Sequence, residues 1–126
     1  MKKAIRDSKA PAAIGPYSPA IQVGNQLFVS GQIPVNSENG ALVKDTIENA
    51  TKQVMENITR LLEAADFNLN DIVKCSIFLK DFNDFKKMND VYSSFFEKDP
   101  PARETVEVSR LPLDALIEIS CIAIKS

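Results

Sequence analysis

The chain has 126 residues, of which 44% are hydrophobic and 25% are charged. A chain of this length is expected to form a single domain, residues 1–126, and can bury enough apolar surface to fold without disulfide bonds. The formal net charge of −2 predicts no basic surface for nucleic acid or for an anionic membrane. Histidine is absent, which excludes the commonest general base, the commonest metal ligand and every histidine-based triad.

The first residues give no sign of export. Arg6, Asp7 and Lys9 are charged, no apolar signal-peptide core follows them, and no apolar run is long enough to span a membrane. Cys75 and Cys121 fall in predicted strands at a spacing unlike that of metal sites, so we expect buried free thiols in a reducing compartment. We therefore expect a cytoplasmic protein with neither a membrane nor a nucleic acid as partner.

The first third of the chain predicts short strands around an ordered loop. Residues 10–19 contain three prolines and one glycine, which impose an extended, irregular path. Tyr17 in this loop either contributes to a site or packs the loop against the domain. Gly31, inside a strand, indicates a bulge or a close approach by backbone or ligand. The strands predicted here cover residues 2–6, 22–24 and 27–33, with a tight turn between the last two.

The rest of the chain predicts two helices and three strands. Apolar residues recur at spacings of three and four over about residues 46–65, which is typical of an amphipathic helix. A second helix follows Asp81, and Asn89 lies beside its apolar stripe, where it can point into the edge of a pocket. The stripe, which we interpret as core, consists of Phe85, Met88, Tyr92, Phe95 and Phe96. The strands cover residues 72–80, 103–108 and 115–125, which gives the order β-β-β-α-β-α-β-β.

Two amphipathic helices need one apolar sheet face, so we predict an α+β fold with both helices on the same face. The odd-numbered strand residues supply that face, and in the strand at 72–80 they are Val73, Cys75, Ile77 and Leu79. The even-numbered residues are too apolar for a solvated surface and too polar for a core, which indicates contact with another subunit. They include Phe28, Ser30, Gln32, Ser76, Phe78, Glu118, Ser120, Ile122 and Ile124.

Arg103 and Glu118 are the main chemical feature of the sequence. Arg103 follows Pro101 and Ala102, and its planar guanidinium can hold a carboxylate through two parallel hydrogen bonds. Glu118 lies in an otherwise apolar strand, where a shifted pKa would let it orient or deprotonate a water molecule. A structural ion pair, even between these two side chains, is the alternative. The sequence has no phosphate loop, dinucleotide motif, metal cluster or nucleophile elbow.

Several segments together resemble the RidA (YjgF/UK114-type) family of reactive-imine deaminases. The matching motifs follow in order at residues 10–18, 30–35, 71–74, 101–103, 106–108, 110–112 and 117–119. The resemblance implies a chorismate-mutase-like α+β fold with a mixed sheet, in a homotrimer whose sheets form a central barrel with active sites in clefts between subunits. It also implies hydrolysis of 2-imino and 2-enamino acids to 2-keto acids and ammonia, without a metal or an organic cofactor.

The resemblance also implies a role for each candidate site residue. Arg103 matches the arginine that binds the substrate carboxylate. Glu118 matches the glutamate that holds or activates the attacking water. The positions that match pocket-lining residues are Tyr17, Ser30, Gly31 and Asn89.

The chain departs from the family pattern directly after Arg103. Many members carry a small residue and then a cysteine there, whereas this chain has Glu104 and Thr105. Thr105 is expected to offer its backbone groups and its hydroxyl to the ligand. Glu104 would weaken anion binding if its side chain pointed into the pocket. This departure motivates an alternative to deamination, a non-enzymatic regulatory module that binds small carboxylates in the same intersubunit cleft.

Overall fold

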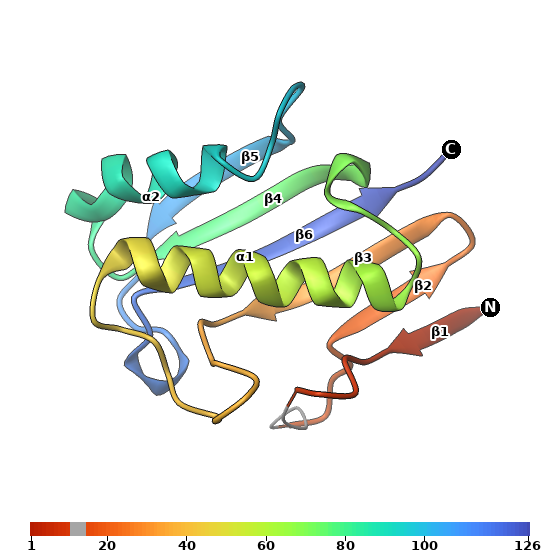
Figure 1. Cartoon of the computed structure of the whole chain (residues 1–126), viewed down its shortest axis with the longest axis horizontal. Coiled ribbons are helices and arrows are strands. Elements are labelled where there is room, and N and C mark those ends of the chain that lie inside the picture. Colours follow the sequence, from red (N-terminus) through yellow and green to blue (C-terminus); the bar gives the residue numbers. More distant parts are fainter. Residues whose placement is uncertain (11–14) are drawn as a thin grey trace.

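Two helices cover one face of a six-stranded sheet in the computed structural model, which describes residues 1–10 and 15–126 (Figure 1). The helices are α1, Ile47–Ala64, and α2, Phe85–Ser93. The strands are β1, Lys2–Ile5; β2, Ala20–Val23; β3, Gln26–Gln32; β4, Ile72–Leu79; β5, Ala102–Glu107; and β6, Ile117–Ile124. The predicted order of elements is confirmed. Part of the loop predicted at 10–19, residues 11–14, lies outside the described residues.

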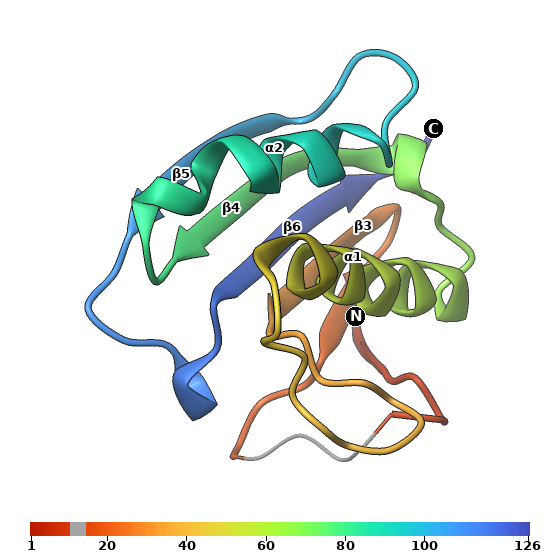
Figure 2. The same ribbon diagram turned by 60° about the vertical axis from the view of Figure 1, so that its left-hand side comes forward.

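The strands are arranged in the order β1-β2-β3-β6-β4-β5. Strands β4 and β5 are parallel, and the other neighbouring pairs are antiparallel. The parallel pair is connected through α2, because the chain must return to the same end of the sheet before β5 begins. Figure 2 shows both helices on the same side of the sheet, with α2 in front of β4 and β5. The arrangement confirms the predicted α+β fold with a mixed sheet and both helices on one face.

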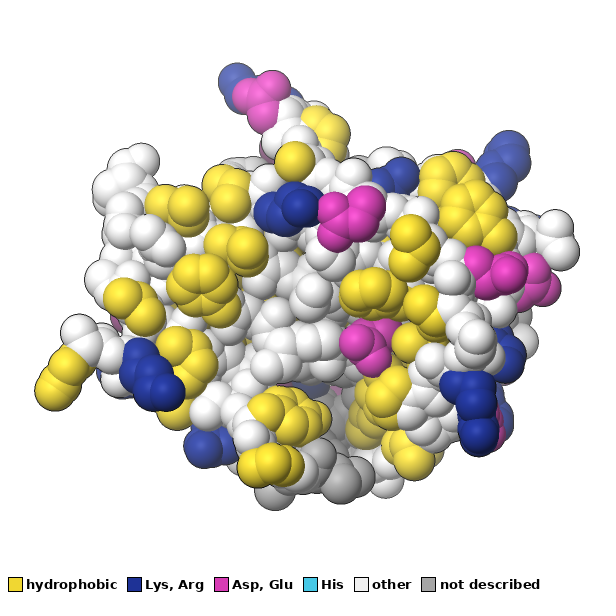
Figure 3. All heavy atoms as spheres, turned by 180° about the vertical axis from the view of Figure 1, so that it is seen from behind, with side chains coloured by type: hydrophobic (Ala, Val, Ile, Leu, Met, Phe, Trp, Pro, Cys, Tyr) yellow, Lys and Arg dark blue, Asp and Glu magenta, His cyan; other side chains and the backbone are white. Residues whose placement is uncertain are grey.

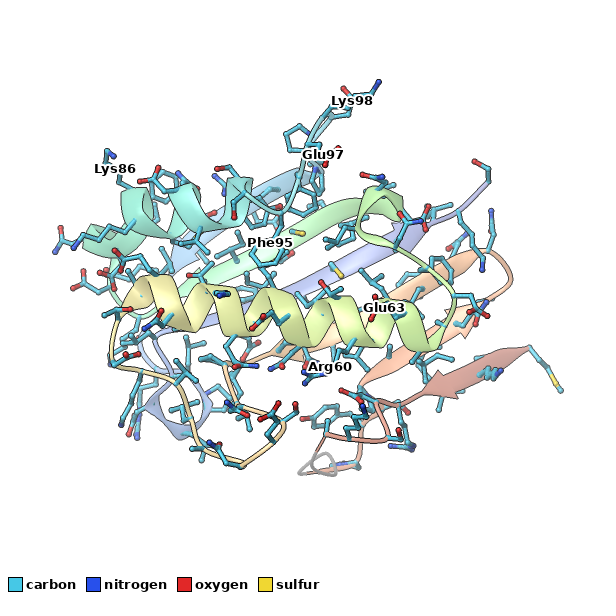
Figure 4. All side chains as sticks on the ribbon, viewed as in Figure 1. Arg60, Glu63, Lys86, Phe95, Glu97 and Lys98 are labelled. Atoms are coloured by element: carbon cyan, nitrogen blue, oxygen red, sulfur yellow. The ribbon has the colours of Figure 1, made fainter. Side chains whose placement is uncertain are left out.

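Helix α1 combines a buried apolar stripe with a matched N-terminal cap. The side-chain oxygen of Thr46 accepts a hydrogen bond from the backbone N–H of Asn49 at 3.0 Å. Arg60, which is labelled in Figure 4, forms an ion pair with Asp7 at 2.6 Å that fastens the segment after β1 to the helix. The fully buried stripe includes Val54, Met55, Ile58 and Leu62. Neither helix of the described chain is long and apolar enough to cross a membrane.

Alternate strand residues build the helix-facing side of the sheet, as predicted, except where two bulges intervene. The pairing of β4 with β6 shifts after Ile72, so Ile72 is 4% exposed whereas Val73 is 43% exposed. The prediction that Val73 faces the helices is wrong, because the extra residue reverses the alternation. Strand β3 also shifts in the segment that contains Gly31, which confirms the predicted irregularity. Gln32 then pairs with the buried Ile119, so its predicted place on the opposite face is wrong.

The opposite side of the sheet, here called the bare face, is not covered by either helix (Figure 3). It includes Ile21, Phe28, Ser30, Lys74, Ser76, Phe78, Glu104, Val106, Glu118, Ser120, Ile122 and Ile124. Phe28 and Ile124 are 41% exposed, and Val106 is 43% exposed. Figure 3 shows hydrophobic and polar side chains interspersed over this face. Exposed apolar side chains gathered on one face indicate an interaction surface.

Candidate functional site

Arg103 projects from β5 toward α2. In the β4–β5 register it lies beside the buried Cys75, so its side chain is on the helix-facing side of the sheet. Its Nη1 donates a hydrogen bond to Oδ1 of Asn89 at 2.6 Å. Its Cζ lies 5.7 Å from the ring centroid of Phe85 and 5.1 Å from that of Tyr92, within range of cation–π attraction. Among the described residues Arg103 is in no ion pair, so its charge is not neutralised.

Strand β5 turns Glu104 away from Arg103. Successive residues of a strand point to opposite faces, so Glu104 projects from the bare face. There its carboxylate accepts a hydrogen bond from the Ser76 hydroxyl and forms an ion pair with Lys74 at 3.0 Å. The Ser76 hydrogen bond and the Lys74 ammonium together lower the pKa of Glu104. The negative charge that follows Arg103 in the sequence is therefore directed away from the guanidinium.

Thr105 lies on the same side of the sheet as Arg103, two residues further along β5. Its Oγ1 is buried and has no hydrogen-bond partner among the described residues. A buried hydroxyl without a partner is unfavourable by about 1–3 kcal/mol, so a polar group that reached it would be bound favourably. Thr105 thus retains unused hydrogen-bonding capacity.

Glu118 lies on the bare face, opposite Phe78 of β4. Its carboxylate occupies the space that a side chain at Gly31 would fill, since a Cβ built there would lie 2.7 Å from Glu118 Cδ. In the described part of the chain the carboxylate forms no ion pair. Burial raises the pKa of Glu118 above the ordinary value of 4.5. A carboxylate of this kind can accept a proton from a bound water molecule.

Ser30 ties the loop that carries Tyr17 to strand β3. Its hydroxyl donates a hydrogen bond to the backbone carbonyl of Ser18 at 2.7 Å, and its backbone N–H donates to the carbonyl of Pro19 at 2.9 Å. The Ser30 hydroxyl proton is therefore used to anchor the loop. Tyr17 is 51% exposed, so its ring is accessible at the surface.

Apart from Tyr17, which lies in the loop before β2, the predicted site residues form two groups on opposite faces of the sheet. The arginine group is Asn89, Arg103 and Thr105 on the helix-facing side, and the glutamate group is Ser30, Gly31 and Glu118 on the bare side. Arg103 pairs with Cys75 of β4, and Glu118 pairs with Phe78 of the same strand. Because Cys75 and Phe78 are separated by about 10 Å along β4, Arg103 and Glu118 are separated by about the same distance along the strand direction. An ion pair between Arg103 and Glu118 of one chain is therefore excluded. A single site that contains both side chains requires a second copy of the chain.

Other features of the described residues lie apart from both groups. Two open grooves run along α1 and share Gln53 and Glu56, and no member of either group lines them. No three His, Cys, Asp or Glu side chains in the described ranges are placed to hold a metal ion. Cys75 and Cys121 are neighbours in β4 and β6 and are both buried and free, which confirms the predicted thiols.

The sequence pattern did not predict that Arg103 contacts aromatic side chains of α2. Phe85 and Tyr92 belong to the stripe that we interpreted as core, and Tyr92 is only 4% exposed. Asn89 lies between them on the same side of α2, four residues after Phe85 and three before Tyr92. A polar side chain within an apolar helical stripe is the signal that this side of the helix meets a polar partner.

Gly31→Ala is expected to lower the turnover of any reaction that uses Glu118 by about ten- to a hundredfold, because the new methyl group displaces the carboxylate. The fold should tolerate the change, since the displaced atoms are the free end of a flexible side chain. Steady-state kinetics and a thermal melt of the same sample test both parts. Wild-type turnover in a well-folded variant would contradict the placement of Glu118 beside Gly31.

The model of a protein family described as "Endoribonuclease L-PSP" matches residues 7–125. The chain belongs to this family. A RutC family protein of Pyrococcus horikoshii is 54% identical over 125 residues, which cover 99% of both chains. The 2-iminobutanoate/2-iminopropanoate deaminase of Escherichia coli is 44% identical over 128 residues, which also cover 99% of both. A crystal structure of E. coli TdcF with bound serine has a TM-score of 0.93 at 38% identity, and the match covers 98% of this chain and 99% of that one.

These similarities confirm the resemblance to the RidA family that the motifs indicate. The names of the relatives differ in what they convey. The P. horikoshii protein is named only for its family, whereas the E. coli deaminase is named for an activity. The L-PSP family therefore includes imine deaminases.

Proposed function

We propose that this chain hydrolyses 2-imino and 2-enamino acids to 2-keto acids and ammonia. The observation that carries the proposal is the state of Arg103, which is held by the neutral Asn89 and forms no ion pair in the described residues. Its charge is thus available to an anion, and every 2-imino acid carries a carboxylate beside the reacting carbon. The E. coli deaminase and the serine-bound TdcF structure support this class of ligand, since serine also carries a carboxylate.

In this proposal the active assembly is a homotrimer whose sheets form a central barrel. The apolar residues of the bare face, such as Phe28, Val106 and Ile124, are then buried between copies. The arginine group of one copy faces the glutamate group of the next across each interface. A closed ring repeats the same contact, so every cleft holds one Arg103 and one Glu118.

Arg103 binds the substrate carboxylate through two parallel N–H···O hydrogen bonds. Asn89 uses one N–H of Nη1, which leaves the other guanidinium donors for the ligand. Thr105 and Tyr17 line the cleft and contact the rest of the substrate. The grip on the carboxylate fixes the position of the neighbouring imine carbon, C2, relative to Glu118 of the adjacent copy.

Glu118 acts in its ionised form on the attacking water. It accepts a proton as the water oxygen bonds to C2, and the C=N double bond becomes a single bond in the carbinolamine. Protonated Glu118 then gives its proton to the carbinolamine nitrogen, the C–N bond breaks and ammonia leaves, while the carbinolamine hydroxyl loses its proton to the ionised Glu118 carboxylate to give the keto acid. Imines of this kind already hydrolyse in water, so positioning the substrate and one water molecule accounts for the acceleration.

A coupled assay tests the proposal. An amino-acid oxidase or a dehydratase generates the imine from several amino acids, and keto-acid release is followed with wild-type protein and with Arg103→Ala. We expect wild-type protein to accelerate release and Arg103→Ala to leave it at the background rate. Unchanged release with folded wild-type protein would reject deamination. If a 2-keto acid then still raised the melting temperature, the non-enzymatic carboxylate-binding module would be the correct reading.

A further inference from the structure

Three side chains on one side of α2 contact the Arg103 guanidinium. Phe85, Asn89 and Tyr92 are spaced so that all three lie on this side of the helix. Asn89 holds Nη1, while the rings of Phe85 and Tyr92 lie 5.7 and 5.1 Å from Cζ. We propose that Phe85 and Tyr92 are positioning residues, which hold the guanidinium in the orientation in which it can form two parallel hydrogen bonds to a carboxylate. The catalytic consequence of this role rests on the proposed function.

A single hydrogen bond does not fix the orientation of an arginine side chain. The bond to Asn89 fixes one nitrogen but leaves the guanidinium plane free to rotate about it. Only some of these orientations present two adjacent N–H groups to a carboxylate. Contact of the delocalised cation with aromatic rings restricts the remaining rotation, because the attraction falls when the cation leaves the rings.

The two rings are themselves held in place by other aromatic side chains. Phe85 stacks on Phe82 with centroids 4.8 Å apart and an interplanar angle of 14°. Tyr92 packs against Phe96 with centroids 5.0 Å apart. A ring with such support resists displacement, so it can restrain the cation beside it.

Tyr92 acts through its ring and not through its hydroxyl. The hydroxyl oxygen is buried beside the Cys75 thiol, and burial together with that thiol raises the pKa of Tyr92. Among the described residues the hydroxyl therefore makes no polar contact that would hold the guanidinium. Since Phe85 lacks a hydroxyl altogether, the feature that the two residues share is an aromatic ring close to Cζ.

The test replaces the Phe85 ring and follows both kinetics and the arginine itself. Phe85 is only partly buried, so Phe85→Leu is compatible with folding. We expect it to raise KM for the imine by about 5- to 20-fold with a smaller change in kcat, and Phe85→Tyr to restore the wild-type KM. Phe95→Leu is the matched control, because Phe95 lies near α1 and packs on the core (Figure 4). It makes no cation–π contact with Arg103 within the described chain.

Side-chain NMR of the arginine Nε–H groups provides a readout that does not depend on activity. The chain has four arginines, so the Arg103 signal can be assigned by substitution. We expect the Arg103 order parameter to be high, as in a rigid group, in wild-type protein and in Phe95→Leu, and to fall below about 0.6 in Phe85→Leu. An Arg103 signal that stays equally rigid in Phe85→Leu, or that is mobile in the wild type, would overturn the positioning role. Absence of imine turnover in the wild type would overturn the proposed function alone.

Discussion

Arg103→Lys is expected to lower kcat/KM for the imine substrate by about a hundredfold or more, mainly through a higher KM. Lysine keeps the positive charge but presents one ammonium group, which cannot form two parallel hydrogen bonds to a carboxylate. It also loses the planar cation that lies beside the rings of Phe85 and Tyr92. Steady-state kinetics, together with the dissociation constant of a 2-keto acid, would measure the effect.

Arg110→Lys is the matched control for this prediction. Arg110 is highly exposed and forms an ion pair with Asp114 at 3.6 Å, outside both site groups. The same chemical change there should leave kcat/KM within about twofold of the wild type. If Arg103→Lys behaved like Arg110→Lys, then the two-point grip on the carboxylate would be ruled out.

Glu118→Gln is expected to lower kcat by about a hundred- to ten-thousandfold with a much smaller change in KM. Glutamine has nearly the same shape, so it can still occupy the space beside Gly31, but it cannot accept a proton from water. Because the Glu118 pKa is raised by burial, wild-type kcat should fall with decreasing pH at a higher pH than an ordinary glutamate of pKa 4.5 would give. Retention of wild-type kcat in the variant would show that another group activates the water.

The same substitution should stabilise the fold at neutral pH. A raised carboxyl pKa means that the folded state binds the proton more tightly than the unfolded chain does. The stability of the wild type therefore falls as pH rises from the pKa of Glu118 in the unfolded chain through its pKa in the folded chain. Glu118→Gln cannot titrate, so its stability does not fall in this way. Thermal melts should show the variant melting above the wild type at pH 8, with a difference that disappears below the ordinary glutamate pKa of 4.5.

Alternation along single strands allowed part of the site to be predicted. Strand β6 pairs with β4 without a register shift from Ile117 to Ile122. Counting alternate residues therefore placed Glu118 correctly on the bare face. The same alternation within β5 separates Arg103 from Glu104, once the face of one of them is known. Which of these two residues faces the helices depends on the crossover through α2, and a sequence pattern does not show how that helix lies over β5.

Both wrong placements have the same physical origin. Ile72 and Val73 are adjacent, apolar and β-branched, so no property of either residue indicates which of them faces the helices. The bulge in β4 decides it by pairing, which depends on β6 more than forty residues later in the chain. Gln32 is similar, because the predicted irregularity at Gly31, a bulge or a close approach, does not tell how the following residue pairs, which depends on the register with Ile119.

The aromatic contacts of Arg103 illustrate a different limit. An apolar stripe on α2 is needed for the core, so Phe85 and Tyr92 satisfy the helical pattern without any further role. Their second role depends on a cation from another element, and no spacing within α2 records the presence of Arg103. Only the polar Asn89 within the stripe gave a local sign of it.

The central claim is that Arg103 and Glu118 act together across an interface between copies, and mixed oligomers test it most directly. Arg103→Ala and Glu118→Gln, each inactive alone, are unfolded together at equal concentrations, refolded and assayed. Random mixing gives each cleft a one-half chance of an intact Arg103 and a one-half chance of an intact Glu118, so about a quarter of wild-type activity should return. If each cleft took both residues from one chain, then every cleft would lack one of them. Activity no higher than the sum of the separate variants, in oligomers shown to be mixed, would contradict the account.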